Sequence, residues 1–219
     1  MRLKAALPPA VLADTRRRLI EAAGRVFADK GYRAATVREI IRLAGVNLAA
    51  VNYHFRGKEG LYAAVLEQTY VRALEKHPPE GGVDPHAGPA ERLFGFIRSF
   101  LERIFDEEAQ ACYGKLMARE LVEPTAALDE VADRIRPLFG RLCGIVGELL
   151  GPGADPGRID RSAKSVVGQI LFYKHAAPVL ERLEGRRRGR PDIEALARHI
   201  ADFSLHGLGG SRPGTRRSR

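Results

Sequence analysis

The sequence contains no tryptophan, only two cysteines and two methionines, and no apolar run long enough to cross a membrane. Cys112 and Cys143 stand alone, without a C-x-x-C pair or a histidine-rich run, which argues against a zinc site and a secreted disulfide framework. Residues 1–13 lack the apolar segment of a signal peptide. We therefore expect a cytoplasmic protein that binds no metal and no cofactor and contacts no membrane.

Short catalytic motifs are also absent. The chain has no G-x-G-x-x-G after a strand, no G-x-x-x-x-G-K-[ST], no H-E-x-x-H and no G-x-S-x-G, and its six histidines are scattered. These absences argue against an enzyme. We therefore expect a protein that acts by binding a partner.

Positive charge is concentrated at the two ends of the chain. Of the net charge of +9, residues 1–60 contribute +7, from 12 Lys or Arg and 5 Asp or Glu. Residues 209–219 add four arginines and no acid, which leaves residues 61–208 at −2. Neutralising phosphates requires positive charge gathered in one place, so this distribution is typical of a polyanion-binding segment joined to a near-neutral body.

Helical periodicity dominates the sequence, and no stretch alternates like a strand between turns, so the predicted fold class is all-α with about nine helices. A first helix can begin at an Asp14 cap and end at Gly31. Thr36 opens a short second helix through a T-x-x-E capping box, Gly45 ends it, and Asn47 can cap a third. The residues expected to face inward are Leu19, Ile20, Ala23, Val26, Phe27, Val37, Ile40, Ile41, Ala44, Val51 and Phe55.

After a helix at 58–76, the prolines and glycines of 77–89 interrupt regular structure. Apolar stripes predict further helices near 90–105 and 113–124, then at 125–150, 158–182 and 191–207, with a bend at Pro137 in the third of these. The last two helices have a wide apolar surface, which predicts a two-fold interface with a second copy.

Residues 36–55 carry the strongest functional signal. Their sequence, TVREIIRLAGVNLAAVNYHF, predicts two short helices joined by a tight turn at Gly45. This is the helix-turn-helix arrangement, in which the second helix lies in the DNA major groove while the first braces it.

The segment LIEAAGRVFADKGYRAATVREIIRLAGVNLAAVNYHFRGKEGLYAAVL resembles the TetR family of transcription regulators over about residues 14–66. It has the F-x-x-x-G-Y helix end, a T-x-x-x-I second helix, the G-V turn, the Y-H-F end of the recognition helix and K-E-x-L-Y opening the fourth helix. RELVEPT at 119–125, IRPL at 135–138 and GQILFYKHAAPVL at 168–180 resemble the CecR-like branch of that family.

The resemblance implies a domain organisation. We expect a DNA-binding domain, followed by a helical domain that binds an effector and forms a homodimer, with helix 58–76 connecting them. The expected boundaries are a flexible arm at 1–13, the helix-turn-helix domain at 14–57, the effector-binding and dimerisation domain at 58–208 and a disordered basic tail at 209–219.

The resemblance also implies roles for individual residues. Thr36 and Arg38 begin the second helix, where a hydroxyl, free N–H groups and a cation can meet a phosphate. The exposed start of the recognition helix should face base edges, and its far end should hold the DNA backbone. The expected base-facing residues are Leu48, Ala49, Ala50 and Asn52, the last for an adenine or a phosphate. Asn47 is expected to contact DNA at the start of the same helix, and the expected backbone contacts are Tyr53, His54 and Lys58.

Other readings of these residues stay open. Tyr53 and His54 could cover the edge of a three-helix core, and the neighbouring arginines Arg16, Arg17 and Arg18 are as consistent with a solvated face as with a DNA contact. Cys112 and Cys143 are expected to be small buried apolar side chains. An exposed loop is the simplest interpretation of Arg186, Arg187, Arg188 and Arg190. The aromatic stripe of Phe96, Phe100 and Phe105 is expected to belong to the core, so that only part of it would line a pocket.

The implied mechanism is repression of a palindromic operator, relieved when a small molecule binds among the helices of 90–180 and helix 58–76 moves the two recognition helices apart. The expected effector pocket combines aromatic walls with a few polar groups. Its candidate residues are Phe100, Tyr113, Met117, Phe172, Tyr173 and His175. Activation from the same kind of operator remains an alternative, as does an adaptor or RNA-binding module without sequence preference.

Overall fold

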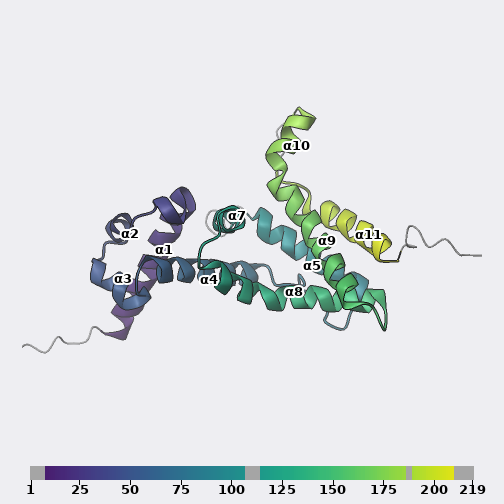
Figure 1. Ribbon diagram of the computed structural model, residues 1–219, viewed down its shortest axis with the longest axis horizontal. Helices are drawn as coiled ribbons and strands as arrows, with labels where there is room; N and C mark the ends of the chain where they lie inside the picture. Colours follow the sequence, from purple (N-terminus) through teal and green to yellow (C-terminus); the bar gives the residue numbers. More distant parts are fainter. Residues whose placement is uncertain (1–7, 107–113, 186–188, 210–219) are drawn as a thin grey trace, which may run out of the picture. The chain divides into compact units, whose positions relative to one another are not determined.

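The computed structural model describes residues 8–106, 114–185 and 189–209, and all regular structure in these ranges is helical, which confirms the all-α fold class (Figure 1). None of the described helices is long and apolar enough to span a bilayer. The helices are α1 (Pro9–Ala34), α2 (Val37–Ala44), α3 (Leu48–Phe55), α4 (Lys58–Lys76), α5 (Pro89–Phe105), α7 (Lys115–Val122), α8 (Leu128–Leu150), α9 (Pro156–His175), α10 (Ala177–Glu184) and α11 (Ile193–Gly209).

The chain divides into two compact units. Unit 1 comprises residues 1–75 and 106–134, and unit 2 comprises residues 76–105 and 135–219. Unit 1 thus combines α1, α2, α3 and α4 with α7 and the first turns of α8. The functional division at residue 58 stays a prediction, because packing alone does not assign a function to either part.

Unit 1 is built on the apolar face of α1, which contacts α2, α3 and α7. Leu19 and Phe27 are fully buried, as are Ile40 on α2 and Val51 on α3. These residues recur at helical spacing on one side of each helix, so they leave water together when the helices pack. The rings of Phe27 and Tyr62 meet edge to face, with centroids 4.8 Å apart.

The beginning of α1 differs from the sequence prediction. The helix begins at Pro9 rather than at an Asp14 cap, and the amides of Val11 and Leu12 donate to the Pro8 carbonyl at 3.0 and 3.2 Å. Proline suits a first helical position because its φ is preset and its missing N–H would have no helical partner. Residues 9–13 of the predicted arm are therefore helical, whereas residues 1–7 lie outside the described part.

The end of α1 follows the prediction more closely. Gly31 has φ 77 and ψ 169, so the regular helix is interrupted at this glycine even though helical residues continue to Ala34. A left-handed φ favours glycine, which has no Cβ to clash with the backbone. The glycine stop expected from the sequence is confirmed at this position.

Unit 2 has a separate apolar core, in which α5 packs against α9 and α11. Leu93, Ile97 and Leu101 on α5 are fully buried, as are Ile170 on α9 and Ile200 on α11. Phe100 and Phe105 lie at its half-buried margin. The aromatic stripe of α5 therefore belongs to the core and its margin, as the sequence predicted.

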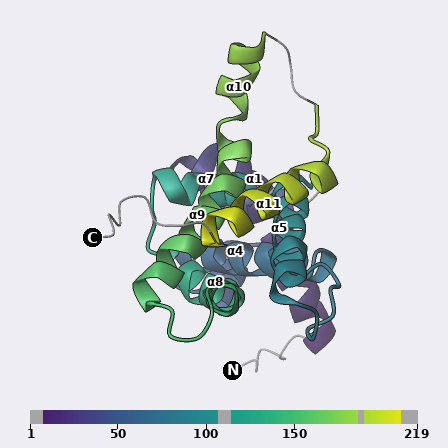
Figure 2. The same cartoon turned by 90° about the vertical axis from the view of Figure 1, so that its right-hand side faces the viewer.

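The predicted helix at 158–182 is in fact two helices that meet at Ala176. Pro178 explains the division, because it has no N–H to donate to the carbonyl four residues earlier. The second of these helices, α10, has no buried residue and extends away from α9 and α11 (Figure 2). Pro137, by contrast, lies within the continuous helix α8. The predicted tail begins at Gly209, the last residue of α11, and its remaining residues lie outside the described part.

Candidate nucleic-acid interface

The turn between α2 and α3 is formed by local hydrogen bonds. The Thr36 hydroxyl accepts from the Glu39 amide at 3.2 Å and so caps α2, while the Glu39 carboxylate accepts from Lys30 Nζ at 2.7 Å. Gly45 ends the helix with φ 64, and the amide of the next residue, Val46, donates to the Ile41 carbonyl at 3.1 Å. The threonine half of the predicted capping box is confirmed, whereas the glutamate contacts α1.

The third helix is capped by the residue predicted to cap it. Asn47 Oδ1 accepts from the Ala50 amide at 3.1 Å. Val51 and Phe55 face the core, as the sequence predicted. This register points the other side of α3 away from unit 1, since side chains on one helix face repeat every three to four residues.

The predicted base-facing residues lie on that outer side. Leu48 is 53% exposed, Ala49 and Asn52 are exposed, and Ala50 is half-buried at the edge of the core. Leu48 thus leaves about half of a large apolar side chain in water. The geometry thus offers a short helix whose outer face is mainly apolar, with one amide side chain at Asn52.

The far end of α3 carries aromatic and cationic groups. Tyr53 is 70% exposed, and its ring meets the half-buried ring of His54 edge to face, with centroids 4.9 Å apart. Lys58 Nζ donates to the Arg33 carbonyl at 3.3 Å and lies 4.5 Å from the centroid of the Tyr32 ring. Burial lowers the pKa of Lys58 from its ordinary value. The structure brings these three residues to one end of α3, and Thr36 and Arg38 are exposed at the start of α2.

Two of the three adjacent arginines of α1, Arg17 and Arg18, have different partners. Arg17 forms ion pairs with Asp14 at 2.6 Å and Glu21 at 3.0 Å, so it belongs to a solvated helix face. Arg18 Nη2 donates to the carbonyl oxygens of Ala44 and Gly45, the latter at 3.3 Å. Arg18 therefore binds the free carbonyls at the end of α2 and holds the turn that positions α3.

Residues outside the helix-turn-helix also support it. Glu120 on α7 is 1% exposed and accepts hydrogen bonds from the Tyr62 hydroxyl at 2.7 Å and from the Thr125 amide at 3.0 Å. The neighbouring Arg119 donates to the Asp29 carbonyl of α1 at 3.1 Å. Sequence reasoning missed these residues. A signal was available, because Glu120 lies four residues after the buried Leu116 and so shares its inward face.

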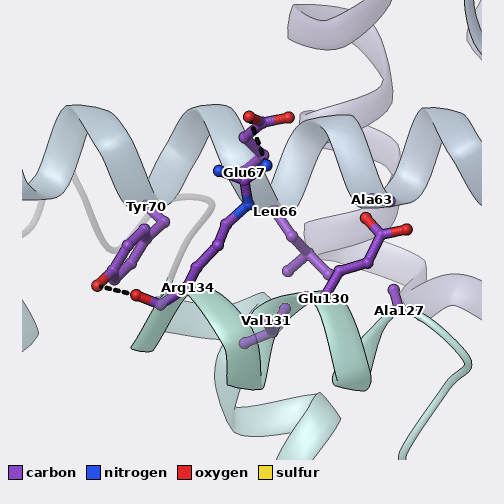
Figure 3. A pocket seen from close by; sticks show the side chains of 8 residues that line it. All are labelled: Ala63, Leu66, Glu67, Tyr70, Ala127, Glu130, Val131 and Arg134. Atoms are coloured by element: carbon purple, nitrogen blue, oxygen red, sulfur yellow. Dashed lines mark hydrogen bonds and ion pairs between the residues drawn. The ribbon is translucent and has the colours of Figure 1, made fainter. Parts of the chain in front are cut away.

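A small cleft separates α4 from the first turns of α8 within unit 1 (Figure 3). Its cavity of about 10 Å³ holds about one water molecule. Arg134 pairs with Glu67 at 2.6 Å, and the Tyr70 hydroxyl donates to the Arg134 carbonyl at 3.1 Å. The cleft is too small for an organic effector, and these contacts hold the start of α8 against α4.

The predicted effector residues are only partly grouped. Phe172 and Tyr173 line an open groove of about 390 Å³ on α9 and α11, together with Gln169, His199 and Phe203. Phe100 packs against Phe96, with ring centroids 6.3 Å apart, and His175 is exposed at the end of α9. Met117 is half-buried on α7 in unit 1, and Tyr113 lies outside the described residues.

Cys143 is half-buried and forms no disulfide among the described residues, and Cys112 lies outside them. Burial, followed by the nearby Asp160 carboxylate, raises the pKa of the Cys143 thiol. A raised pKa keeps the thiol protonated and poorly nucleophilic near neutral pH. Cys143 therefore suits the sequence interpretation of a small buried hydrophobe.

Two family models match separate regions of the chain. The model described as bacterial regulatory proteins, tetR family, matches residues 19–65. The model of the C-terminal domain of the HTH-type transcriptional dual regulator CecR matches residues 89–208, which is more than half of the chain.

Individual proteins agree with these matches. The HTH-type transcriptional dual regulator CecR of Shigella flexneri is 30% identical over 176 residues, which cover 74% of this chain and 76% of the relative. The A-factor receptor protein of Streptomyces griseus is 39% identical over 210 residues, covering 86% and 73%. A TetR-like transcriptional regulator from Rhodococcus sp. RHA1 has the same fold, with a TM-score of 0.65, 21% identity and coverage of 94% of this chain and 100% of that one.

The two matched regions correspond to the helix-turn-helix in unit 1 and to the helices from α5 to α11. The resemblance inferred from the sequence motifs is thereby confirmed, including the CecR-like branch. The chain belongs to the TetR family of bacterial regulatory proteins, with a C-terminal domain of the CecR type, and it is a DNA-binding transcription regulator rather than an enzyme.

Proposed function

We propose that this regulator is a repressor that binds a palindromic operator as a homodimer and is released by a small-molecule effector. One observation carries the DNA-binding part of the proposal. The helix α3 is capped at Asn47, anchored through Val51 and Phe55, and leaves Leu48, Ala49 and Asn52 exposed on the opposite side. A short helix held in this way is suited to enter a major groove about 12 Å wide.

In this proposal the outer face of α3 reads base edges. Leu48, Ala49 and Ala50 contact thymine methyl groups, and Asn52 contacts an adenine or a phosphate. Asn47 contacts DNA at the start of the same helix. The backbone contacts that fix the register are made by Thr36, Arg38, Tyr53, His54 and Lys58.

The homodimer would form through α9 and α11. Phe203 on α11 lines the open groove on these helices and is 65% exposed, which leaves large apolar surfaces in water within a single copy. Covering such surfaces with a second copy stabilises a two-fold assembly. Two recognition helices would then lie about 34 Å apart, one turn of DNA, on a palindrome.

The effector would bind within the range 58–208, among the candidate residues Phe100, Tyr113, Met117, Phe172, Tyr173 and His175. The contacts of α7 and α8 in unit 1 provide a route for its effect. Arg134 and Tyr70 tie the start of α8 to α4, and α8 continues along the chain into unit 2. An effector that binds one arrangement of these helices more tightly shifts the population of the DNA-binding state.

Activation is a second candidate function because the relative CecR is named a dual regulator. Repression and activation use the same protein–DNA contacts and differ in where the operator lies relative to the promoter. A reporter gene with the operator placed over, and then upstream of, the promoter separates the two. Expression that rises when the gene for this chain is deleted supports repression.

Selection of randomised duplex DNA by the full-length protein, at low and moderate salt, tests the operator. A palindrome whose preference over other sequences survives moderate salt supports the proposal. Binding that falls with salt equally for every sequence would instead support an adaptor or RNA-binding module without sequence preference.

The effector pocket requires a separate test with the reporter gene and a library of candidate small molecules. Once an inducing compound is found, we expect His175→Ala or Tyr113→Phe to change the concentration needed for induction and to leave operator affinity unchanged. Lys164→Ala on the exposed surface of α9 is the control. Unchanged induction in both pocket variants would reject this pocket.

A further inference from the structure

The C-terminal end of α3 receives cations from residues that are distant in the sequence. The guanidinium of Arg16, on α1, lies 5.6 Å from the centroid of the Phe55 ring in the last turn of α3. Its positive charge and, more strongly, burial lower the pKa of His54. Arg56 follows Phe55 directly and is exposed. Two arginines thus flank a helix end whose free carbonyls carry partial negative charge.

Arg56 has an unusual backbone conformation. Its φ is 60, and it is the one non-glycine residue with positive φ in the part of the chain that the structure describes. Its amide donates to the Asn52 carbonyl at 3.1 Å and so ends α3. Glycine or asparagine adopts this conformation at lower cost than arginine does. A non-glycine residue in this conformation is often kept because its side chain has a use.

The environments of the neighbouring arginines indicate what that use is. Arg17 is paired with two carboxylates, and Arg18 is bound to backbone carbonyls. Among the described residues, no carboxylate lies within 4.0 Å of Arg16 or Arg56. A guanidinium that lies over an aromatic ring, as that of Arg16 does, keeps N–H groups free for an oxygen acceptor such as a phosphate.

We infer that Arg16 and Arg56 form a phosphate clasp, which binds the DNA backbone that passes the C-terminal end of α3. The inference rests on the proposed function, which assigns Tyr53, His54 and Lys58, at the same end of α3, to contacts with the DNA backbone. The clasp also counteracts the repulsion between phosphates and the negative end of the helix dipole. Its ligand is the phosphodiester group, without preference for any base.

The test measures operator affinity of the full-length dimer at several salt concentrations. The variants are Arg16→Gln and Arg56→Asn, because asparagine tolerates the left-handed backbone while removing the charge. A dimer on a palindrome loses two phosphate contacts for each substitution. The slope of log affinity against log salt should then become shallower by about 1.8, and the affinity loss between 50 and 200 mM salt should shrink about tenfold.

Two further variants make the test specific. Arg17→Gln removes the same charge from the adjacent residue, whose partners are carboxylates, and should retain the wild-type slope. Arg56→Lys keeps the positive charge that Arg56→Asn removes, so its slope of log affinity against log salt should stay close to that of the wild type. The melting temperature of Arg56→Asn should equal or exceed that of the wild type, which separates loss of DNA binding from loss of folding.

The results distinguish the clasp from the proposed operator. Wild-type slopes in both Arg16→Gln and Arg56→Asn would overturn the clasp, as would an equal change in Arg17→Gln, which would show only an effect of net charge. If the wild type has no sequence preference but the two variants still reduce the slope, the clasp is supported and the operator proposal fails.

Discussion

The hydroxyl of Tyr62 on α4 donates a 2.7 Å hydrogen bond to the carboxylate of Glu120 on α7, and both side chains are almost completely buried in unit 1. The two residues are 58 positions apart in the sequence. Glu120 also binds the amide and hydroxyl of Thr125, so one carboxylate joins α4, α7 and the segment before α8. The helix α4, which the sequence predicted to connect the two domains, is thereby held by residues of α7 and of the segment before α8.

Replacing this carboxylate should destabilise the protein. In Glu120→Gln the amide keeps one acceptor oxygen, but its NH₂ group faces donors and leaves buried polar groups without partners. We expect a loss of about 1 to 3 kcal/mol in the free energy of unfolding, measured by urea denaturation. Glu123→Gln, an exposed neighbour, is the control and should change stability by less than about 0.5 kcal/mol. Equal stability of the two variants would contradict this role.

The turn glycine should not tolerate alanine. Gly45 has φ 64, and a Cβ at this position would lie 2.6 Å from Arg18 Nη2. Gly45→Ala should cost about 1 to 2 kcal/mol from backbone strain and also weaken operator binding, because the turn orients α3. Gly140→Ala, within α8 and with open space around it, should instead raise stability by about 0.5 to 1 kcal/mol. Thermal unfolding of both variants checks the opposite signs.

Asn47 has a capping role that can be separated from its proposed DNA contact. Asn47→Ala removes the acceptor for the Ala50 amide and should cost about 1 kcal/mol of stability. Asn47→Ser keeps a cap and should retain stability, so any loss of operator affinity in this variant reports contact with DNA. Unfolding and operator binding are measured on both proteins. Full operator affinity in Asn47→Ser would limit Asn47 to capping.

Operator binding should depend on pH through His54. Burial and, to a lesser extent, the charge of Arg16 lower the pKa of His54 below 6.5 in the folded protein. A phosphate beside the ring would raise this pKa, so binding would take up protons and operator affinity should increase as the pH falls below 6.5. Affinity measured from pH 7.5 to 5.5 checks the direction.

The lowered pKa of His54 has the opposite effect on folding, because it makes the folded protein less stable as the pH falls. The unfolded chain binds the His54 proton more readily, so the stability that His54 contributes is present above pH 6.5 and is lost as the pH falls through the lowered pKa. His54→Gln should flatten both dependences at this site. Persistence of the full pH dependence of operator affinity in His54→Gln would assign it to another group.

Local signals predicted the parts of the fold in which neighbouring residues decide the structure. The caps at Thr36 and Asn47 and the turn at Gly45 depend on side chains and backbone within a few residues, and all three are confirmed. Two predicted helix limits were wrong, because proline favours the first turn of a helix but interrupts a helix when it lies in the interior. Pro9 starts α1 earlier than Asp14 would, and Pro178 separates α10 from α9.

The roles of the arginines could not be predicted in the same way. Arg16, Arg17 and Arg18 are consecutive and chemically identical, yet one lies over Phe55, one pairs with acids on its own helix and one binds the end of α2. Successive helix positions differ in direction by about 100°, so each arginine meets a different neighbour. Which neighbour it meets depends on how α2 and α3 pack on α1.

The sequence by itself determined the all-α class, the helix-turn-helix, the inward faces of α1 and α3 and the family, because these follow from helical periodicity, capping residues and a long motif. Only the tertiary structure decided that Arg18 braces the turn, that Glu120 is buried against Tyr62, and that Arg16 lies at the end of α3. The physical reason is that these contacts join residues 26 to 58 positions apart, and their geometry exists only after the helices pack.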